Sequence, residues 1–188
     1  GEALLGLAKT FEDQISPIKN KDIIPYFYGD NMFFEDAFQL YSKISPNNLQ
    51  FSLDIYDSIL VTIPESSLIT EAQFRLAEIQ YRIIEDFDKA SALYINALSK
   101  NPPMKLKKNI ILRIADVLLA KGEHKNSITF LDSVYNIYQI QEIKNKLVEV
   151  HLFSGDPDTA LSIINETFSL ITPLNSSFND LMEIRDII

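Results

Sequence analysis

The sequence predicts an all-α fold made of antiparallel helix pairs in series, and three observations support this prediction. Apolar residues recur at helical spacing, as in the run Ile110, Ile111, Ile114, Val117 and Leu118. Capping residues and prolines fall between these periodic stretches. Similar helix pairs also recur along the chain. Sustained alternation of apolar and polar residues is absent, and we therefore expect no sheet.

The periodic stretches predict helices near residues 2–14, 33–44, 49–63, 70–84, 87–100, 106–121, 125–139, 142–154, 157–171 and 178–187. Asp156 followed by Pro157 indicates a helix start, because aspartate caps free amides and proline suits the first helical position. Thr70 with Gln73 predicts a capping box at another start. Gly122 suits a left-handed residue at a helix end.

Composition excludes several classes of function. The 188 residues suit one domain or one compact repeat array, and 46% of them are apolar, which is enough for a core. A net charge of −9 argues against nucleic acid as the main ligand. No run approaches the roughly 20 apolar residues that span a membrane. The chain has no cysteine, which excludes disulfides and thiolate metal sites and leaves the compartment open between cytoplasm and bacterial envelope, including the periplasm.

A repeat becomes visible when the expected turns are aligned. Small residues stand near the start of four expected second helices, at Ser52, Ala90, Ser127 and Ala160. Four residues after each of them comes a large side chain, at Tyr56, Tyr94, Leu131 and Ile164. The preceding helices carry steps such as Leu76-Ala77, Ile114-Ala115 and Leu7-Ala8, and small residues of this kind let two helices approach closely. We therefore expect Ala77, Ala90, Ala115 and Ala160 to be buried at helix crossings.

This pattern resembles the tetratricopeptide repeat family, with repeats at 33–64, 71–102, 108–140 and 141–173. Residues 71–102 match best, and residues 33–64 match only in their second helix. The resemblance implies a single domain over 1–188 that winds as a right-handed superhelix, with an irregular N-terminal part at 1–32 and a C-terminal capping helix at 174–188. Ser52, Ser127 and Val148 depart from the family's small residues, and the chain has no tryptophan.

The stretch from Tyr56 to Ala77 is similar to bacterial cell-envelope members of the family. These include lipoproteins of outer-membrane assembly and coordination proteins of the Tol system.

In tetratricopeptide proteins the first helices line a concave groove, and the residue after each small residue points into it. The resemblance therefore implies that an acid faces the groove in three successive repeats, flanked mainly by apolar residues. The predicted groove residues are Phe74, Glu78, Tyr81, Leu112, Asp116, Leu119, Asn145, Glu149 and Leu152. Such a groove would suit a protein or peptide with basic groups and apolar anchors. The alternative is that these acids only form a solvated helix face.

No pattern for catalysis or metal binding stands out. His124 and His151 are the only histidines, and alone they form neither a catalytic triad nor a zinc site. Asp156-x-Asp158 lacks the remaining ligands of a calcium loop, and helix capping explains it. Glycine-rich phosphate loops are absent. We therefore expect no enzyme activity, no metal and no cofactor.

The sequence thus predicts a protein-interaction scaffold or adaptor that binds a partner protein or peptide. The alternative is the non-catalytic helical region of a larger enzyme or of a cell-envelope assembly machine. Phe178, Leu181, Met182 and Ile188 are apolar at helical spacing, so the last helix should cover the final pair. Its outer face should then remain apolar, and we expect either a homodimer through this C-terminal helix or a further repeat downstream.

Overall fold

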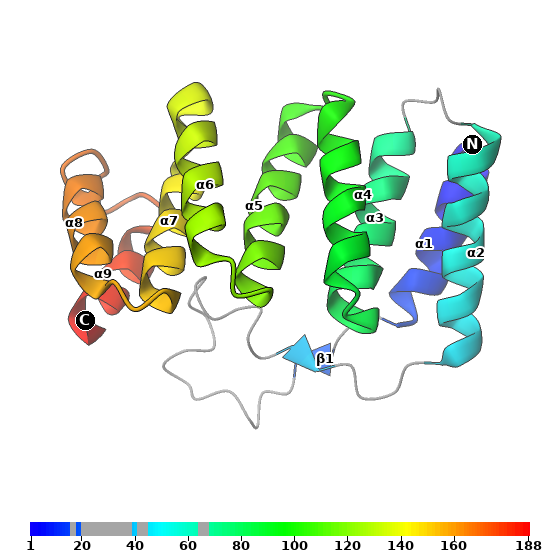
Figure 1. The fold of residues 1–188 in the computed structure, drawn as a ribbon, viewed down its shortest axis with the longest axis horizontal. Helices are drawn as coiled ribbons and strands as arrows, with labels where there is room; N and C mark the ends of the chain where they lie inside the picture. The colour runs from blue at the N-terminus through cyan, green and yellow to red at the C-terminus, as the bar shows by residue number, and fades with distance from the viewer. Residues whose placement is uncertain (16–17, 20–38, 41–44, 64–67) are drawn as a thin grey trace. The chain divides into compact units, whose positions relative to one another are not determined.

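A computed structural model describes residues 1–15, 18–19, 39–40, 45–63 and 68–188. In these ranges the chain forms nine α-helices, one π-helical turn and one short pair of strands (Figure 1). The described residues divide between two compact units, the first ending at Val117 and the second beginning at Leu118.

The first unit contains α1 (Glu2–Asp13), α2 (Pro46–Thr62), α3 (Ile69–Ile79), α4 (Phe87–Ser99) and most of α5 (Met104–Ala120). Helix α1 packs against α2, α2 against α3, and α3 against α4. The π-helical turn η2 (Gln80–Ile84) continues α3. Strands β1 (Ile18–Lys19) and β2 (Gln39–Leu40) pair antiparallel, with Ile18 opposite Leu40.

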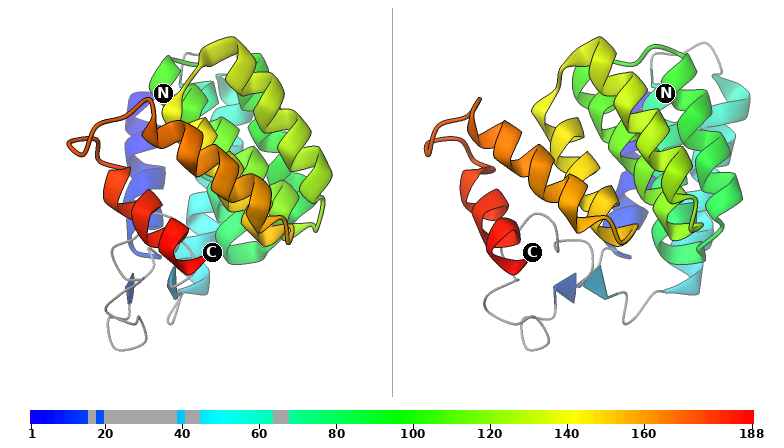
Figure 2. Two further views of the ribbon diagram at one scale, coloured as in Figure 1. Left: turned by 90° about the vertical axis from the view of Figure 1, so that its left-hand side faces the viewer. Right: turned by 60° about the vertical axis from the view of Figure 1, so that its left-hand side comes forward.

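The second unit contains the end of α5, followed by α6 (His124–Tyr138), α7 (Gln141–Phe153), α8 (Pro157–Phe168) and α9 (Phe178–Ile187). Helix α7 packs against both α6 and α8, and α9 packs against α8 (Figure 2). Leu181 and Ile184 of α9 are buried against Val148, Ala160 and Ile164. The last helix therefore covers the final pair, as predicted.

The helices predicted at 2–14 and from residue 49 onward are confirmed, with ends that differ by three residues or fewer when η2 (Gln80–Ile84) is counted as the end of α3. Residues 70–171 form six helices, the first of which ends in η2, and contain no strand. The helix predicted over 33–44 is wrong at Gln39 and Leu40, which form β2. The rest of that range lies outside the described residues. The expectation of no sheet misses β1 and β2, because two-residue strands are too short to produce an alternating pattern.

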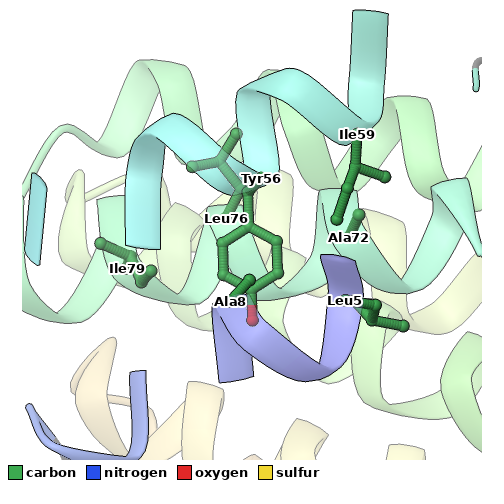
Figure 3. Packing of buried hydrophobic residues seen from close by; sticks show 7 residues of the cluster. All are labelled: Leu5, Ala8, Tyr56, Ile59, Ala72, Leu76 and Ile79. Atoms are coloured by element: carbon green, nitrogen blue, oxygen red, sulfur yellow. The ribbon is translucent and has the colours of Figure 1, made fainter. Parts of the chain in front are cut away.

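The partner of α2 is α1, which precedes it by more than thirty residues. Ser52 lies on Ala8, with its hydroxyl 3.4 Å from the Ala8 carbonyl oxygen, so the small residues of the two helices meet. Figure 3 shows Tyr56 pointing from α2 toward Ala8. These residues belong to a buried cluster that joins three helices, formed by Leu5, Ala8, Tyr56, Ile59, Ala72, Leu76 and Ile79.

The small residues singled out by the repeat are fully buried. Ala77, Ala90, Ala115 and Ala160 have no exposed surface, and neither have Ser52 and Ser127. The predicted burial of these alanines is therefore confirmed. It follows that the repeat alignment identified real packing positions.

The turns inside two later pairs share one geometry. Gly122 and Gly155 have φ angles of 74° and 79°, and the amide of the next residue bonds to the carbonyl five residues back in both turns. Glycine adopts this left-handed conformation without steric cost, which suits it to end a helix. Asp156 then caps α8 by accepting from the Thr159 amide at 3.2 Å, as predicted.

The start and the end of α3 differ from prediction. The capping box is wrong, because α3 begins at Ile69, which places Thr70 and Gln73 inside the helix. At the other end, Ala90 lies 13 positions after Ala77. The corresponding spacing is 12 positions from Ala115 to Ser127 and from Val148 to Ala160. The π-helical turn η2 accommodates this extra residue, because a π-helix holds more residues per turn than an α-helix.

A candidate interaction surface on the first helices

The nine predicted groove residues are divided between the two units. Phe74, Glu78, Tyr81, Leu112 and Asp116 belong to the first unit, on α3, η2 and α5, and Leu119, Asn145, Glu149 and Leu152 belong to the second unit, on α5 and α7. Seven of the nine are half-buried, while Asp116 and Asn145 are buried. Whether the nine line one groove stays a prediction.

Glu78 is held by three side chains rather than presented to solvent. Its Oε1 accepts from the Tyr94 hydroxyl of α4 and lies 3.1 Å from Nε of Arg113 on α5. Its Oε2 lies 2.9 Å from Nε of Arg82. Because both carboxylate oxygens are engaged and the side chain is only 16% exposed, Glu78 is a structural centre of this unit.

Asp116 belongs to the same network. Nη1 of Arg113 donates to its Oδ2 at 2.8 Å, while Nε of the same arginine faces Glu78. The Asp116 side chain is 8% exposed, against 22% for Arg113. One guanidinium thus pairs with two of the predicted groove acids.

A similar arrangement occurs one helix pair earlier. The Tyr56 hydroxyl of α2 donates to Oε2 of Glu12 on α1, and Nη1 of Arg75 on α3 donates to Oε1 of Glu12 at 3.2 Å. In both places a tyrosine of a second helix holds a glutamate of its partner helix, and an arginine of the next first helix completes the set. We call this set the clamp. It links consecutive helix pairs within the first unit.

Sequence reasoning missed the basic half of the clamp. Arg75 and Arg113 stand two residues before the small residues Ala77 and Ala115, and Lys146 stands two before Val148. A base at one repeat position in three successive first helices was a detectable signal. Its partner was less visible, because Glu12 and Glu78 occupy different repeat positions.

In the second unit Glu149 is also paired. Nζ of Lys146 lies 2.8 Å from its Oε1 and 2.7 Å from its Oε2. Asn145 has a structural role, since it accepts from Gln141 at 2.9 Å and donates to the Ser177 hydroxyl, next to the start of α9, at 3.0 Å. Leu131 and Ile164 occupy the positions of the clamp tyrosines, so neither of them offers a hydroxyl.

The second unit also buries a lysine that the sequence did not mark. Lys144 is 4% exposed, and its Nζ lies 2.8 Å from Oε1 of Glu166 on α8. The same Nζ stands over the Tyr135 ring of α6, 5.8 Å from the ring centre. A buried charge is costly unless it is paired, so this contact holds α6, α7 and α8 together.

Burial and the adjacent glutamates raise the pKa of both clamp tyrosines above the ordinary value of 10.0, with burial as the larger cause. A raised pKa means that the folded chain binds the phenol proton more tightly than the unfolded chain does. The resulting stabilisation is complete below about pH 10 and is lost as the pH rises above that value.

We therefore expect Tyr56 and Tyr94 to stay protonated at alkaline pH until the chain unfolds. In an ultraviolet titration of the eight tyrosines, phenolate absorbance should rise in two stages, the second coinciding with loss of helical circular dichroism. The double variant Tyr56→Phe, Tyr94→Phe should lack the second stage. Complete ionisation near pH 10 in a folded chain would contradict the clamp.

His151 and Asp156 have structural partners. Nδ1 of His151 lies 3.1 Å from Oδ2 of Asp156, which also caps α8, and bonds from Thr159 lower the Asp156 pKa. Within the described ranges, no three His, Asp or Glu side chains are grouped as metal ligands would be. No helix in the described part of the chain is both long and apolar enough to cross a membrane.

Comparison with known proteins adds no relative from which to transfer a function. The sequence matches no protein-family model, and no curated protein is significantly similar to it.

Proposed function

We propose that the chain is a protein-interaction scaffold of the tetratricopeptide type. In this proposal its helix pairs form a right-handed superhelical array, and its first helices bind a segment of another protein. The repeated features support such an array: buried small residues at helix crossings, matching glycine turns, and the clamp in two successive pairs. Arrays of this kind serve as extended binding surfaces.

One observation carries the binding role. Phe74, Tyr81 and Leu112 are apolar side chains of α3, η2 and α5 that keep part of their surface exposed beside the Glu78 network. Arg113 of α5 links α5 to Glu78 of α3 within this network. A preorganised surface loses less conformational entropy when it binds a partner, and this favours binding. We call these three residues the apolar row.

Selection from a display library of random peptides on the purified chain tests the proposal. We expect enriched peptides whose binding is about tenfold weaker for Tyr81→Ala or Leu112→Ala, since apolar anchors carry much of the energy of such contacts. Ile95→Ala is the matched control, because Ile95 is 55% exposed on the second helix α4. Circular dichroism would verify that every variant folds.

Two outcomes would contradict the proposal. One is a selection that enriches no peptide on the chain. The other is enrichment of peptides that bind Ile95→Ala as poorly as they bind the two variants of the apolar row. The predicted homodimer through α9, where Ile187 and Ile188 are 51% and 42% exposed, stays a prediction.

A further inference from the structure

The charges beside the apolar row cancel one another. The Glu78 network contains two carboxylates, Glu78 and Asp116, and two guanidinium groups, Arg82 and Arg113. Their four formal charges sum to zero, although the whole chain carries −9. Glu78 and Asp116 therefore do not act as two uncompensated negative charges at this surface.

A basic group of a partner would gain little from these acids. To reach Glu78 it would have to displace Arg82 or Arg113, which lie 2.9 and 3.1 Å from the carboxylate oxygens. One ion pair would replace another, and the half-buried guanidinium that was displaced would lose its contact with Glu78. Loss of a partner from a buried ion pair is strongly unfavourable.

The second unit shows the same balance. Glu149 is bound through both oxygens to Lys146, and the two side chains are 18% and 12% exposed. Leu152, one turn further along α7, is half-buried and apolar. Each unit thus places apolar surface beside acids that already have a basic partner.

We infer that the segment bound on the first helices is apolar and nearly uncharged, rather than basic. This inference rests on the proposed function and specifies its ligand class. Apolar side chains of the segment would pack on Phe74, Tyr81 and Leu112. A charged side chain of the segment would be unfavourable beside them, because the carboxylates and guanidinium groups of the Glu78 network are already paired with one another. Burial of apolar surface would supply the binding energy, and salt does not weaken burial.

The peptides enriched in the library selection provide the test. They should have a net charge near zero and several apolar residues. Their dissociation constants should change less than about twofold between roughly 50 and 500 mM salt, since screening acts on charged contacts. Leu112→Ala should weaken their binding about tenfold at both salt concentrations.

The opposite result would overturn the inference and leave the proposed function intact. Enriched peptides would then be rich in lysine and arginine, and would bind at least about tenfold more weakly at the higher salt concentration. Failure to enrich any peptide would instead refute the proposed function, so the two failures are distinguishable.

Discussion

Replacing Glu78 by lysine should lower the free energy of unfolding by roughly 2–4 kcal/mol, near the range for breaking a buried ion pair. The change places a third cation between Arg82 and Arg113 and removes the acceptor of the buried Tyr94 hydroxyl. The side chains of Glu78, Arg82 and Arg113 are 16–22% exposed. Because solvent screens their charges, we expect the loss of stability to lie in the lower part of the energy range given above. Urea denaturation of the wild-type and variant chains measures the difference.

Two companion variants separate the network from charge in general. Glu78→Gln keeps the shape of the side chain and one acceptor, and should therefore lose less stability than Glu78→Lys. Asp57→Lys reverses an exposed acid on α2 of the same unit and should change stability by less than about 0.5 kcal/mol. If Glu78→Lys proved as stable as Asp57→Lys, Glu78 would not be a structural centre.

This expectation changes how charge reversal at the predicted groove acids should be interpreted. Replacing Glu78, Asp116 and Glu149 together by lysine would break the ion pairs of the clamp and the pair between Glu149 and Lys146. The structure would therefore change as well as the charge that a binding partner meets. Weaker binding by such a variant would mainly report lost structure. Variants of the apolar row are the cleaner probe of binding.

Replacing Ala90 by leucine should destabilise the chain by roughly 1–3 kcal/mol, because a larger side chain overpacks a filled core. Ala90 has no exposed surface, and its helix α4 packs directly on α3. Ala92→Leu is the matched control, since Ala92 is exposed on the same helix and both changes add the same atoms. Thermal melts followed by circular dichroism compare the two.

Equal melting temperatures for Ala90→Leu and Ala92→Leu would contradict the close crossing of α3 and α4. The result would also undermine the repeat alignment, which chose Ala90 from its spacing to Ser52, Ser127 and Ala160. A lower melting temperature for Ala90→Leu alone would support both.

The sequence by itself determined the helices and most of their ends, because these depend on neighbouring residues. Asp156 accepts from an amide three residues away, and Gly122 and Gly155 end helices through their own backbone conformation. The burial of Ala77, Ala90, Ala115 and Ala160 was also predictable, since a recurring small residue at fixed helical spacing marks a helix crossing.

Only the tertiary structure decided which distant side chains meet. The pairing of α1 with α2 spans an insertion that no local signal bridges, and η2 depends on how α3 and α4 accommodate one extra residue. Glu78 looked like an exposed groove acid because its repeat position says nothing about Arg113, 35 residues later. Whether a carboxylate faces solvent or an arginine is decided by the separation of two packed helices, and local sequence does not encode that distance.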